Sequence, residues 1–415
     1  MSLVEKTGFP MTKMHRILML VENGPAPADR RVWPEATALR DQGYQVSIIS
    51  PKGPPNHQQS YICLEGIHIY RYRLPAFGDS YIAYIVEYGI AILMTFVLSL
   101  KILFRHGFDV IHAANPPDLF FIIGLFYRLL GKKFVFDQHD LSPELFQVKF
   151  NRSIKPLRKF LLFLERCSYQ AAHLVITSNA SQKRFALERG RCHSGKVYVV
   201  RNGPNPKHVK PVAPEPELKR GGHYLLAYVG SMEVQDGVEN CLFALHDLIQ
   251  KRGRRDVSLV LIGGGNSFPT LKSLAHELQL DEYVTFTGWT MPEDVMRYLA
   301  AADVGLVPDP QNGLNEHCTM IKTMEYMAMG KPVVAFDLAE TRFSAQHAAL
   351  YAAPNCVEDF ASKIDALLDD EPLRLSLGAL GRRRITEALN WEESKKQLLL
   401  AYQALSPHES EATGF

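Results

Sequence analysis

Arg16-Ile-Leu-Met-Leu-Val21 is a short apolar run that ends at the turn-forming pair Asn23-Gly24. A helical pattern follows over about 31–42, and Gly43-Tyr-Gln-Val-Ser-Ile-Ile-Ser50 is a second apolar run. Strand, loop, helix and strand in this order form a βαβ unit, in which the strands are parallel and the crossover is right-handed. This stretch therefore predicts an α/β fold built on a parallel sheet.

The same alternation of strands and helices continues along the rest of the chain. Further short apolar runs typical of buried strands are 110–112, 134–136, 174–177, 197–200, 225–229, 259–262, 284–286, 304–307 and 332–335. The stretch 211–220, rich in proline and charged residues, separates two series of strands and is typical of a linker. We predict two doubly wound, Rossmann-like α/β domains that face each other across a cleft.

The domain boundaries follow from this division. We place an N-terminal Rossmann-like domain at 1–205, a second Rossmann-like domain at 206–385, and a C-terminal helix and tail at 386–415. The region 371–405 is helical by pattern, and we expect the last helix to cross back to the first domain. The length of 415 residues suits two or three domains.

Composition limits the classes of protein that this chain can belong to. Hydrophobic residues make up 47% and charged residues 22%, as in ordinary globular proteins. A net charge of +2 and the lack of a basic stripe argue against nucleic-acid binding. The six cysteines show no metal-ligand spacing, and the N-terminal sequence shows no signal-peptide pattern, so we expect a cytoplasmic protein without disulfides or structural zinc.

The segment 81–104 is almost continuously apolar and is long enough to span a bilayer. It lies between strands of one domain, so a true span would divide a single sheet between the two sides of a membrane. Two interpretations stay open: a buried helix, or a helix that dips an exposed apolar face into the membrane interface. The basic run at 155–166 would suit anionic lipid in the second case, although such runs are commonly solvated helix faces.

The strongest motif for chemistry is Asn315-Glu-His-Cys-Thr-Met-Ile-Lys-Thr-Met-Glu-Tyr-Met-Ala-Met-Gly330. A loop that leads into a helix presents backbone N–H groups and a positive dipole end to a phosphate. Ile321 and Lys322 lie at the start of this helix, where the lysine adds a charge, and Glu325 follows one turn later, where it can accept bonds from ribose hydroxyls. An amphipathic helix with a solvated lysine and glutamate is the alternative.

Three stretches of the first half end predicted strands or start helices. Arg30 and Arg31 follow Gly24 at a helix start, where both are candidates for phosphate contact or are surface arginines. His139 lies in Asp137-Gln-His-Asp140, at a strand's carboxyl end, where open α/β sheets bind ligands. Asn202 lies in the turn Arg201-Asn-Gly203, either at the cleft or in a simple connector.

Taken together, these motifs resemble family 4 of the retaining GT-B glycosyltransferases, over roughly 15–400. The family carries a Glu-x7-Glu element in its second domain, and Glu325 matches the second glutamate, which the resemblance implies binds the nucleotide ribose. The first glutamate falls at His317. The resemblance therefore leaves the contact with the donor sugar open between His317 and its neighbour Glu316. His139 matches the family histidine that lines the reacting sugar, and Asn202 lies in the matching interdomain turn.

The phosphate loop departs from the family pattern. Relatives carry two cations in a glycine-bounded loop after a strand, whereas this chain has Gly230-Ser-Met-Glu-Val-Gln-Asp-Gly237, with Ser231 and Asp236 at the cationic positions. Phosphate binding would then pass to backbone N–H groups, to Lys322, and to Arg30 and Arg31. Gly263 in the triplet 263–265, and Gly288 and Trp289 after another strand, match positions that flank the base in relatives.

The resemblance implies transfer of a sugar from a nucleotide-diphosphate donor, UDP-linked or GDP-linked with UDP favoured, to an acceptor hydroxyl with retention. His139, Glu316, His317 and Lys322 are the expected catalytic residues. We expect no metal and no cofactor, and the apolar segment suggests a lipid-linked acceptor at the inner face of the plasma membrane. The alternatives are an inactive GT-B partner protein, a non-hydrolysing nucleotide-sugar 2-epimerase and, less favoured because no GxGxxG follows the first strand, a dinucleotide oxidoreductase.

Overall fold

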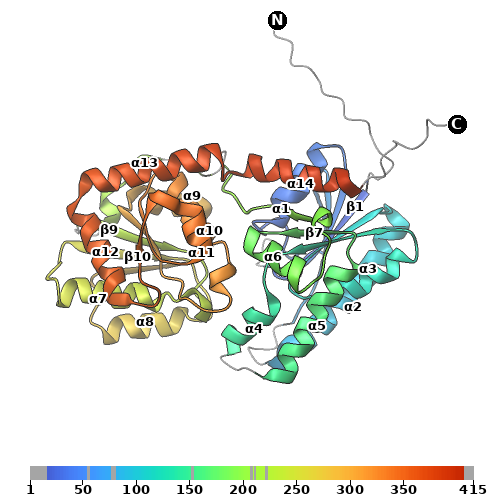
Figure 1. Ribbon diagram of the computed structural model, residues 1–415, viewed down its shortest axis with the longest axis horizontal. Helices are drawn as coiled ribbons and strands as arrows, with labels where there is room; N and C mark the ends of the chain where they lie inside the picture. The colour runs from blue at the N-terminus through green and yellow to red at the C-terminus, as the bar shows by residue number, and fades with distance from the viewer. Residues whose placement is uncertain are drawn as a thin grey trace, which may run out of the picture.

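A computed structural model describes residues 16–405, except 54–56, 76–80, 151–153, 206–208, 210–211 and 220–222. Within this range the chain forms two α/β domains, each built on one sheet (Figure 1). The expectation of a chain start without a signal peptide concerns residues outside the described range. The linker expected at 211–220 is partly described, and it contains a short 3-10 turn at Pro216–Lys219.

The first sheet has the strand order β3-β4-β2-β1-β5-β6-β7-β8. Its strands are β1 (Arg16–Leu20), β2 (Gln45–Pro51), β3 (Tyr61–Leu64), β4 (Ile67–Tyr72), β5 (Val110–Ala114), β6 (Lys133–Gln138), β7 (Leu174–Thr177) and β8 (Val197–Val199). All neighbouring pairs are parallel except the β3–β4 hairpin. Strand order reverses at β1, which lies between β2 and β5, so the ends of β1, β5 and β6 open a crevice.

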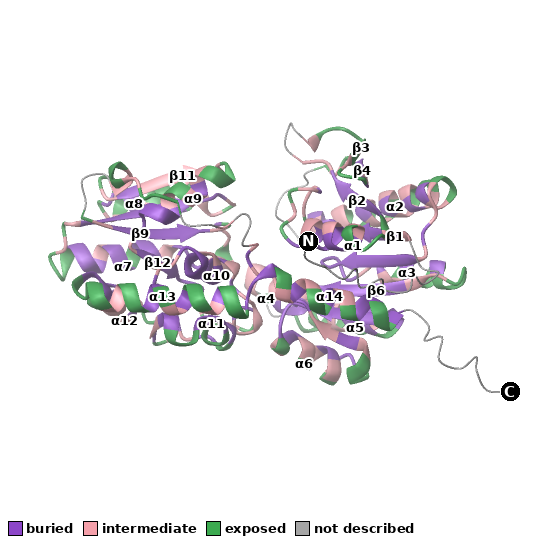
Figure 2. Cartoon of the chain, turned by 90° about the horizontal axis from the view of Figure 1, so that it is seen from above, coloured by how far each residue is buried: buried purple, intermediate pink, exposed green. Residues whose placement is uncertain are grey.

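The second sheet is entirely parallel and has the order β11-β10-β9-β12-β13-β14. Its strands are β9 (Tyr224–Val229), β10 (Val257–Ile262), β11 (Val284–Gly288), β12 (Val304–Val307), β13 (Val333–Phe336) and β14 (Ala349–Ala352). Both faces are covered by helices, so the strands are near-continuous apolar runs (Figure 2). The order reverses at β9, beside β12, which again places a crevice at the carboxyl ends.

Helices cover both faces of each sheet. The first domain contains α1 (Val32–Asp41), α2 (Tyr81–Arg105), α3 (Phe121–Arg128), α4 (Ser142–Phe150), α5 (Lys155–Ala171) and α6 (Ala180–Glu188). The second contains α7 (Glu239–Gln250), α8 (Phe268–Glu277), α9 (Pro292–Ala301), α10 (Ile321–Ala328), α11 (Ala339–Ala345), α12 (Val357–Asp369) and α13 (Glu371–Glu387), and α14 (Trp391–Leu405) ends the described chain. Each sheet therefore separates two apolar cores.

The C-terminal helices join the two domains. Helix α13 packs on the second domain, and α14 crosses to the first, where Leu398 and Tyr402 enter the core beside β1 (Figure 1). The predicted helical region therefore divides in two, because the Asn390 side chain accepts a bond from the Glu393 amide and starts a new helix. The predicted fold class, with the last helix returning to the first domain, is confirmed.

Strands β3, β4 and β14 were not predicted. Strands β3 and β14 have four residues each and lie at sheet edges, so they present too short a pattern to identify. Helix α2 also corrects an expectation, because a fully buried helix is wrong: only 22% of its most apolar window is buried. Phe104 on this helix is 86% exposed, and Ile85 is 63% exposed.

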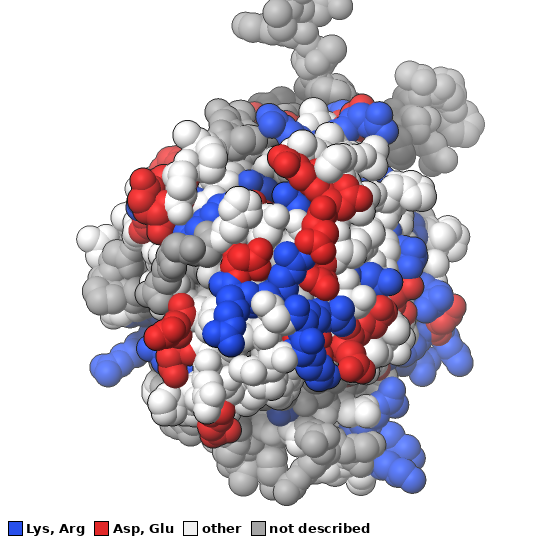
Figure 3. Space-filling view, turned by 90° about the vertical axis from the view of Figure 1, so that its left-hand side faces the viewer, with Lys and Arg blue, Asp and Glu red and all other residues white. Residues whose placement is uncertain are grey.

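The outer end of the second domain carries charges of both signs. In the view of Figure 3, lysines and arginines alternate with acidic side chains over this face. Ion pairs contribute to this pattern, among them Lys251 with Asp247 on α7 and Arg254 with Asp365 on α12. The charges therefore compensate one another locally on this face, in keeping with the small net charge of the chain.

Candidate donor site

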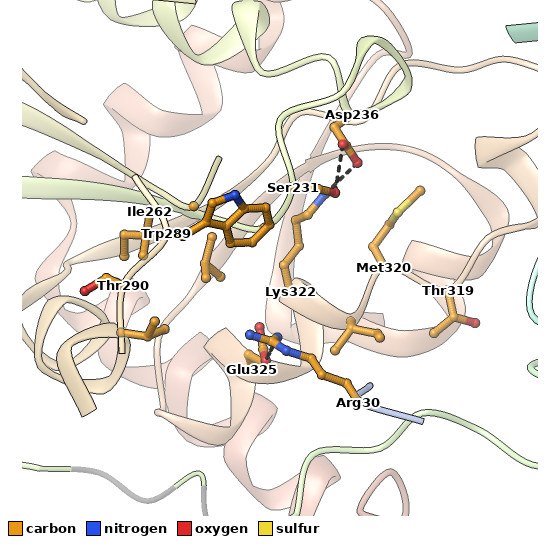
Figure 4. A pocket seen from close by; sticks show the side chains of 15 residues that line it. Arg30, Ser231, Asp236, Ile262, Trp289, Thr290, Thr319, Met320, Lys322 and Glu325 are labelled. Carbon is orange, nitrogen blue, oxygen red and sulfur yellow. Dashed lines mark hydrogen bonds and ion pairs between the residues drawn. The ribbon is translucent and has the colours of Figure 1, made fainter. Parts of the chain in front are cut away.

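A cavity of about 390 Å³ opens at the carboxyl ends of β9, β10 and β11 and at the start of α10 (Figure 4). Most of the predicted donor-binding residues line this cavity: Arg30, Gly230, Ser231, Gly263, Trp289, Ile321, Lys322 and Glu325. All of these except Arg30 come from the second domain. The N-cap of α10, Met320, supplies no side-chain bond to the helix, so the first-turn N–H groups face a site suited to an anion.

Two glycine-rich loops cross at the floor of the cavity. The Gly230 amide donates to the Ile262 carbonyl (3.0 Å), and Gly230 and Gly263 both have positive φ, 150° and 126°. A Cβ atom on Gly263 would lie 1.9 Å from the Gly230 carbonyl oxygen. Glycine is therefore required at position 263, and its absence of a side chain lets the two loop backbones approach each other at the ligand.

Lys322 lies in the cavity wall but already has a partner. Its ammonium is 2.8 Å and 3.0 Å from the two carboxylate oxygens of Asp309, and 3.9 Å from Asp236. Burial would lower the pKa of Lys322, but the charges of Asp309 and Asp236 outweigh burial and raise it. The lysine stays protonated, and much of its charge is neutralised before any diphosphate arrives.

The acidic loop after β9 uses its carboxylates to fold itself. Asp236 accepts bonds from the Ser231 hydroxyl (3.1 Å) and from the Glu233 amide (3.0 Å). Glu233 accepts a bond from the Asn266 amide (3.0 Å). Gly237 ends this turn in the left-handed conformation and packs on Pro310. The predicted lack of cations in this loop is therefore matched by its structure. The acidic side chains of the loop accept bonds from nearby N–H and O–H groups.

Arg30 connects the two domains across the cavity mouth. Its guanidinium donates to Glu325 at 2.8 Å, the two side chains being 65% and 13% exposed (Figure 4). Glu325 is the residue expected to bind ribose hydroxyls, and Arg30 is a cation expected at the diphosphate. Arg30 and Glu325 are therefore paired with each other in this structure.

A second cavity, of about 500 Å³, adjoins the first on the side of the N-terminal domain. It shares Ser231, Asp236, Thr319 and Met320 with the donor cavity. The N-terminal domain contributes Glu22 after β1 and Glu87 on α2. Burial, and then the charge of Glu87, raise the pKa of Glu22 to about 8. The two cavities together provide space for two ligands that meet at the shared residues.

His139 is held by a buried network at the end of β6. Its Nε2 lies 2.7 Å from an Asp137 oxygen, and its amide donates to the Asn115 side chain (2.6 Å). Burial would raise the pKa of Asp137, but the charges of Arg31 and His139 prevail and hold it well below its usual range. The carboxylate therefore orients the imidazole, which stays 15% exposed.

Arg31 and Asn202 are corrected by the structure, since neither lines the donor cavity. The Arg31 side chain is 4% exposed, and it donates to both oxygens of Asp137, to the Val200 carbonyl and to the Asn202 side chain. All three nitrogens of this guanidinium thus donate to groups within the first domain. Arg31 and Asn202 therefore hold the end of β8 against the start of α1, and they do not face a phosphate site.

Glu316 and His317 also lie outside the donor cavity. They belong to a 3-10 turn, Asn315–His317, in which His317 packs edge-on against Phe185 (4.8 Å between ring centroids) and Glu316 accepts a bond from Gln311. The neighbouring Thr319 and Met320 line both cavities instead. Among the predicted glycines, Gly24, Gly237 and Gly288 likewise do not line this cavity.

Sequence reasoning missed Asp309, Thr319, Met320 and Thr290. Asp309 lies two residues after the end of β12, so its place at the carboxyl end of a predicted strand was a usable signal. Thr319 and Met320 precede α10, and their role depends on the direction of the 315–317 turn, which no local pattern indicates.

Two parallel-sheet domains, with a ligand cavity at the strand ends of the second and a cleft toward the first, define the GT-B class. The description "Glycosyltransferase Family 4" matches residues 28–208, and "Glycosyl transferases group 1" matches residues 223–370. Together the two matches span most of the chain. The chain therefore belongs to glycosyltransferase family 4, in its GT-B form.

Curated relatives match parts of this chain. A GDP-mannose-dependent alpha-(1-6)-phosphatidylinositol monomannoside mannosyltransferase of Mycobacterium tuberculosis is 30% identical over 139 residues, 32% of this chain and 36% of the relative. A D-inositol 3-phosphate glycosyltransferase of Corynebacterium aurimucosum is 29% identical over 221 residues, 50% and 51% of the two chains. The chain thus spans about a third to a half of the length of these relatives.

Solved structures match nearly the whole chain in fold. Sucrose-phosphate synthase of Thermosynechococcus elongatus has a TM-score of 0.75 at 21% identity, covering 94% of this chain and 99% of that one. Anabaena HepE in complex with UDP and glucose has a TM-score of 0.71 at 14% identity, covering 94% and 100%. At these identities the similarity establishes the fold.

Proposed function

We propose that the protein transfers a glycosyl unit from a nucleoside-diphosphate sugar to an acceptor hydroxyl, with retention of the anomeric configuration. The observation that carries the proposal is the donor cavity: the Glu325 carboxylate, the start of α10 and two crossed glycine loops surround one space beside Trp289. A carboxylate suits ribose hydroxyls, and helix-start N–H groups suit phosphate. Retention follows the family resemblance.

The leaving diphosphate gains negative charge as the glycosidic bond breaks, so its stabilisation is the main catalytic contribution. Backbone N–H groups at the start of α10 and at the Gly230 loop supply part of it. Arg30 is the exposed cation at the cavity and supplies another part once ribose replaces it on Glu325. Lys322 contributes an oriented ammonium whose charge is largely offset by Asp309. His139, held by Asp137, lines neither cavity, and its place beside the reacting sugar in this proposal rests on the family resemblance alone.

The donor and the acceptor are proposed at different levels of detail. A UDP-sugar is the first candidate donor and a GDP-sugar the second, since HepE was solved with UDP and the mycobacterial relative is named for GDP-mannose. The acceptor is proposed to be lipid-linked, because α2, which lines the acceptor-side cavity, exposes the apolar side chains of Phe104 and Ile85. The protein would then bind peripherally to the inner face of the plasma membrane. The proposal includes no metal and no cofactor.

A donor panel read by thermal shift tests this function, because a ligand that binds the folded state raises the unfolding temperature with concentration. One nucleoside-diphosphate sugar should stabilise the protein and be hydrolysed slowly without acceptor. Glu325→Ala should abolish both effects. Glu316→Ala is the matched control and should retain both, because Glu316 lies outside the cavity.

Three results would reject the proposal or select an alternative. The absence of stabilisation by any donor would contradict donor binding. Stabilisation without hydrolysis or transfer to any acceptor would favour the inactive partner protein, for which the neutralised Lys322 is the supporting observation. Release of an epimerised free donor would favour the 2-epimerase.

A further inference from the structure

A third cavity, of about 110 Å³, lies between α2, α4, α5 and the loop after β5. Apolar side chains form most of its wall, including Leu145 and Phe146 on α4 and Leu161 and Leu164 on α5. Its polar lining is limited to two tyrosines, Asp118, Ser142 and Lys149. One carboxylate oxygen of Asp118 accepts a bond from Asn115 (2.8 Å). This cavity is therefore suited to a hydrocarbon group.

The apolar cavity continues into the acceptor-side cavity. Both are lined by Tyr84, Tyr88, Pro116, Leu145 and Lys149. One passage thus leads from the donor cavity, through a polar chamber with Glu22 and Glu87, to an apolar chamber. A ligand that fills both chambers has a polar head nearest the donor and an apolar tail farthest from it.

Lys149 lies at the junction of the two chambers. Its ammonium is 4.6 Å from the centre of the Tyr84 ring, and among the described residues that line either chamber it is the sole cation. The residues around it in the polar chamber include Glu22, Glu87, Asp140, Asp236 and Asp309. Lys149 stands at the boundary between these acids and a chamber whose one acidic lining residue is Asp118, so it marks the position where an anionic group of the ligand would bind.

The outer surface near the apolar chamber is apolar as well. Phe160 and Phe163 on α5 are 54% and 59% exposed, and Ile85 on α2 is 63% exposed. Helices α2 and α5 also line the chamber. A membrane lipid could therefore reach the chamber from the surface between these helices without crossing the polar cleft.

We propose that the apolar chamber holds the hydrocarbon chain of the acceptor and that Lys149 binds a phosphate joining this chain to the head group. The acceptor class is thus a phosphate-bearing amphiphile whose head carries the accepting hydroxyl. This inference rests on the proposed function, because it identifies the second substrate of the same site. The phosphate distinguishes it from a neutral glycolipid, which would need no cation at the junction.

Calorimetric binding of short amphiphiles tests the assignment, with decyl phosphate, decyl glucoside and inorganic phosphate each used below micelle formation. The native protein should bind decyl phosphate at least ten-fold more tightly than either of the other probes. Lys149→Met keeps the apolar stem and should lower decyl phosphate affinity about ten-fold, to the level of decyl glucoside, as expected for loss of a charge-assisted contact. Lys149→Arg should restore the preference, and Lys155→Met, a change of an exposed lysine at the start of α5, should leave it intact.

A second variant tests the chamber itself. Leu161→Trp fills the space from α5, so it should reduce the gain in affinity between hexyl and decyl phosphate while circular dichroism shows a folded protein. Equal binding of decyl phosphate and decyl glucoside that Lys149→Met leaves unchanged would overturn the inference. Affinity independent of chain length in the native protein would do so too.

The donor thermal shift, measured on the same variants, separates the two proposals. Normal donor stabilisation in Lys149→Met with lost decyl phosphate binding supports both. A different result is also informative: decyl phosphate binds in a lysine-dependent way, but no donor stabilises the protein. This result would support the lipid site and reject the transferase function.

Discussion

At the scale of single residues, the centre of the donor site is a buried ion pair rather than a free cation. Lys322 and Asp309 are 8% and 1% exposed, and the lysine reaches both carboxylate oxygens. The pair gains little net stability because both charges lose their hydration, but each charge depends on the other. Lys322 therefore has a structural role beside any role in catalysis.

Removing one partner of this pair should be costly. Lys322→Met leaves Asp309 buried and unpaired, so the free energy of unfolding should fall by about 3–5 kcal/mol in urea denaturation. Lys322→Met combined with Asp309→Asn should recover a large part of the loss. Lys251→Met removes an exposed pair with Glu358 and leaves Asp247 paired with Arg252, so it is the control and should cost less than about 1 kcal/mol. Equal costs for Lys322→Met and Lys251→Met would contradict a buried pair.

Replacing Arg30 should change the affinities for the nucleoside and for the nucleoside diphosphate in opposite directions. In Arg30→Gln, Glu325 is released for ribose, so a free nucleoside should bind more tightly, by about 0.2–1 kcal/mol for an exposed ion pair. The nucleoside diphosphate should bind more weakly, because its phosphates lose a cation. Isothermal titration with both ligands measures the difference. A uniform loss of affinity for both would show that Arg30 does not compete with ribose.

Glu22 should make stability depend on pH. Its pKa is raised from 4.5 to about 8 by burial, so the folded protein keeps a proton that the unfolded chain releases above 4.5. The resulting contribution to stability is fully present below 4.5 and is lost as the pH rises through about 8.

Glu22→Gln mimics the protonated form at every pH and provides the comparison. The unfolding free energy of the native protein minus that of the variant should decline between pH 4.5 and 8. Glu165, whose pKa burial likewise raises to about 8, is present in both proteins and cancels in the difference. A difference that stays flat over this range would contradict a buried, protonated Glu22.

At the scale of elements, the sequence predicted what apolar periodicity encodes. The run Arg16–Leu20 and the later buried strands form because their side chains are apolar on both faces. The loop directions were not predictable: Glu316 and His317 turn away from the cavity because Phe185, from a distant helix, packs on the imidazole. Arg31 is likewise drawn inward by Asp137, which is far away in sequence. Contacts between distant segments decided each of these sites.

Helices α2, α3 and α5 present an apolar surface that should bind membranes. Their exposed large side chains include Phe104 on α2, Leu129 after α3 and Phe163 on α5. Phe96 of α2 and Phe126 of α3 pack edge-on at 5.1 Å, so these two helices lie side by side. Helix α3 also packs on α5, so the three helices that carry these exposed side chains are neighbours.

Two acidic substitutions on this face should weaken membrane binding. Phe104→Glu with Leu129→Glu removes two side chains that are each 86% exposed. Since burying one such side chain contributes roughly 1.5–3 kcal/mol when complete, partial burial of two should lower the partition into phosphatidylglycerol vesicles roughly ten-fold. Sedimentation with vesicles measures this. Leu375→Glu, on exposed α13 of the second domain, is the control, and equal binding of all three proteins would contradict a membrane face.

At the scale of the whole molecule, the chain passes between domains twice, and the two crossings touch each other. The first crossing follows β8 at Gly203, and the second lies between α13 and α14. The Trp391 amide donates to the Pro204 carbonyl at 3.1 Å, and Gly203 lies against Leu389 and Asn390. In the proposed donor complex, ribose replaces Arg30 on Glu325, so a contact that spans the cleft changes. We expect the two crossings to absorb the resulting change in domain angle.

Gly203→Ala should therefore change domain geometry rather than the donor cavity. Its Cβ would lie 2.6 Å from the Leu389 carbonyl oxygen and from the Asn390 carbonyl carbon, both backbone atoms, so the two crossings must separate. Transfer should slow by an order of magnitude or more, because small displacements of catalytic groups are costly. Nucleoside affinity, set within the second domain, should change little. Small-angle scattering with and without donor would show an altered difference between the two states.

Gly89→Ala on α2, where no atom lies within 4 Å of the new Cβ, is the matched control. Normal transfer in Gly203→Ala would show that the contact between crossings does not set the domain angle.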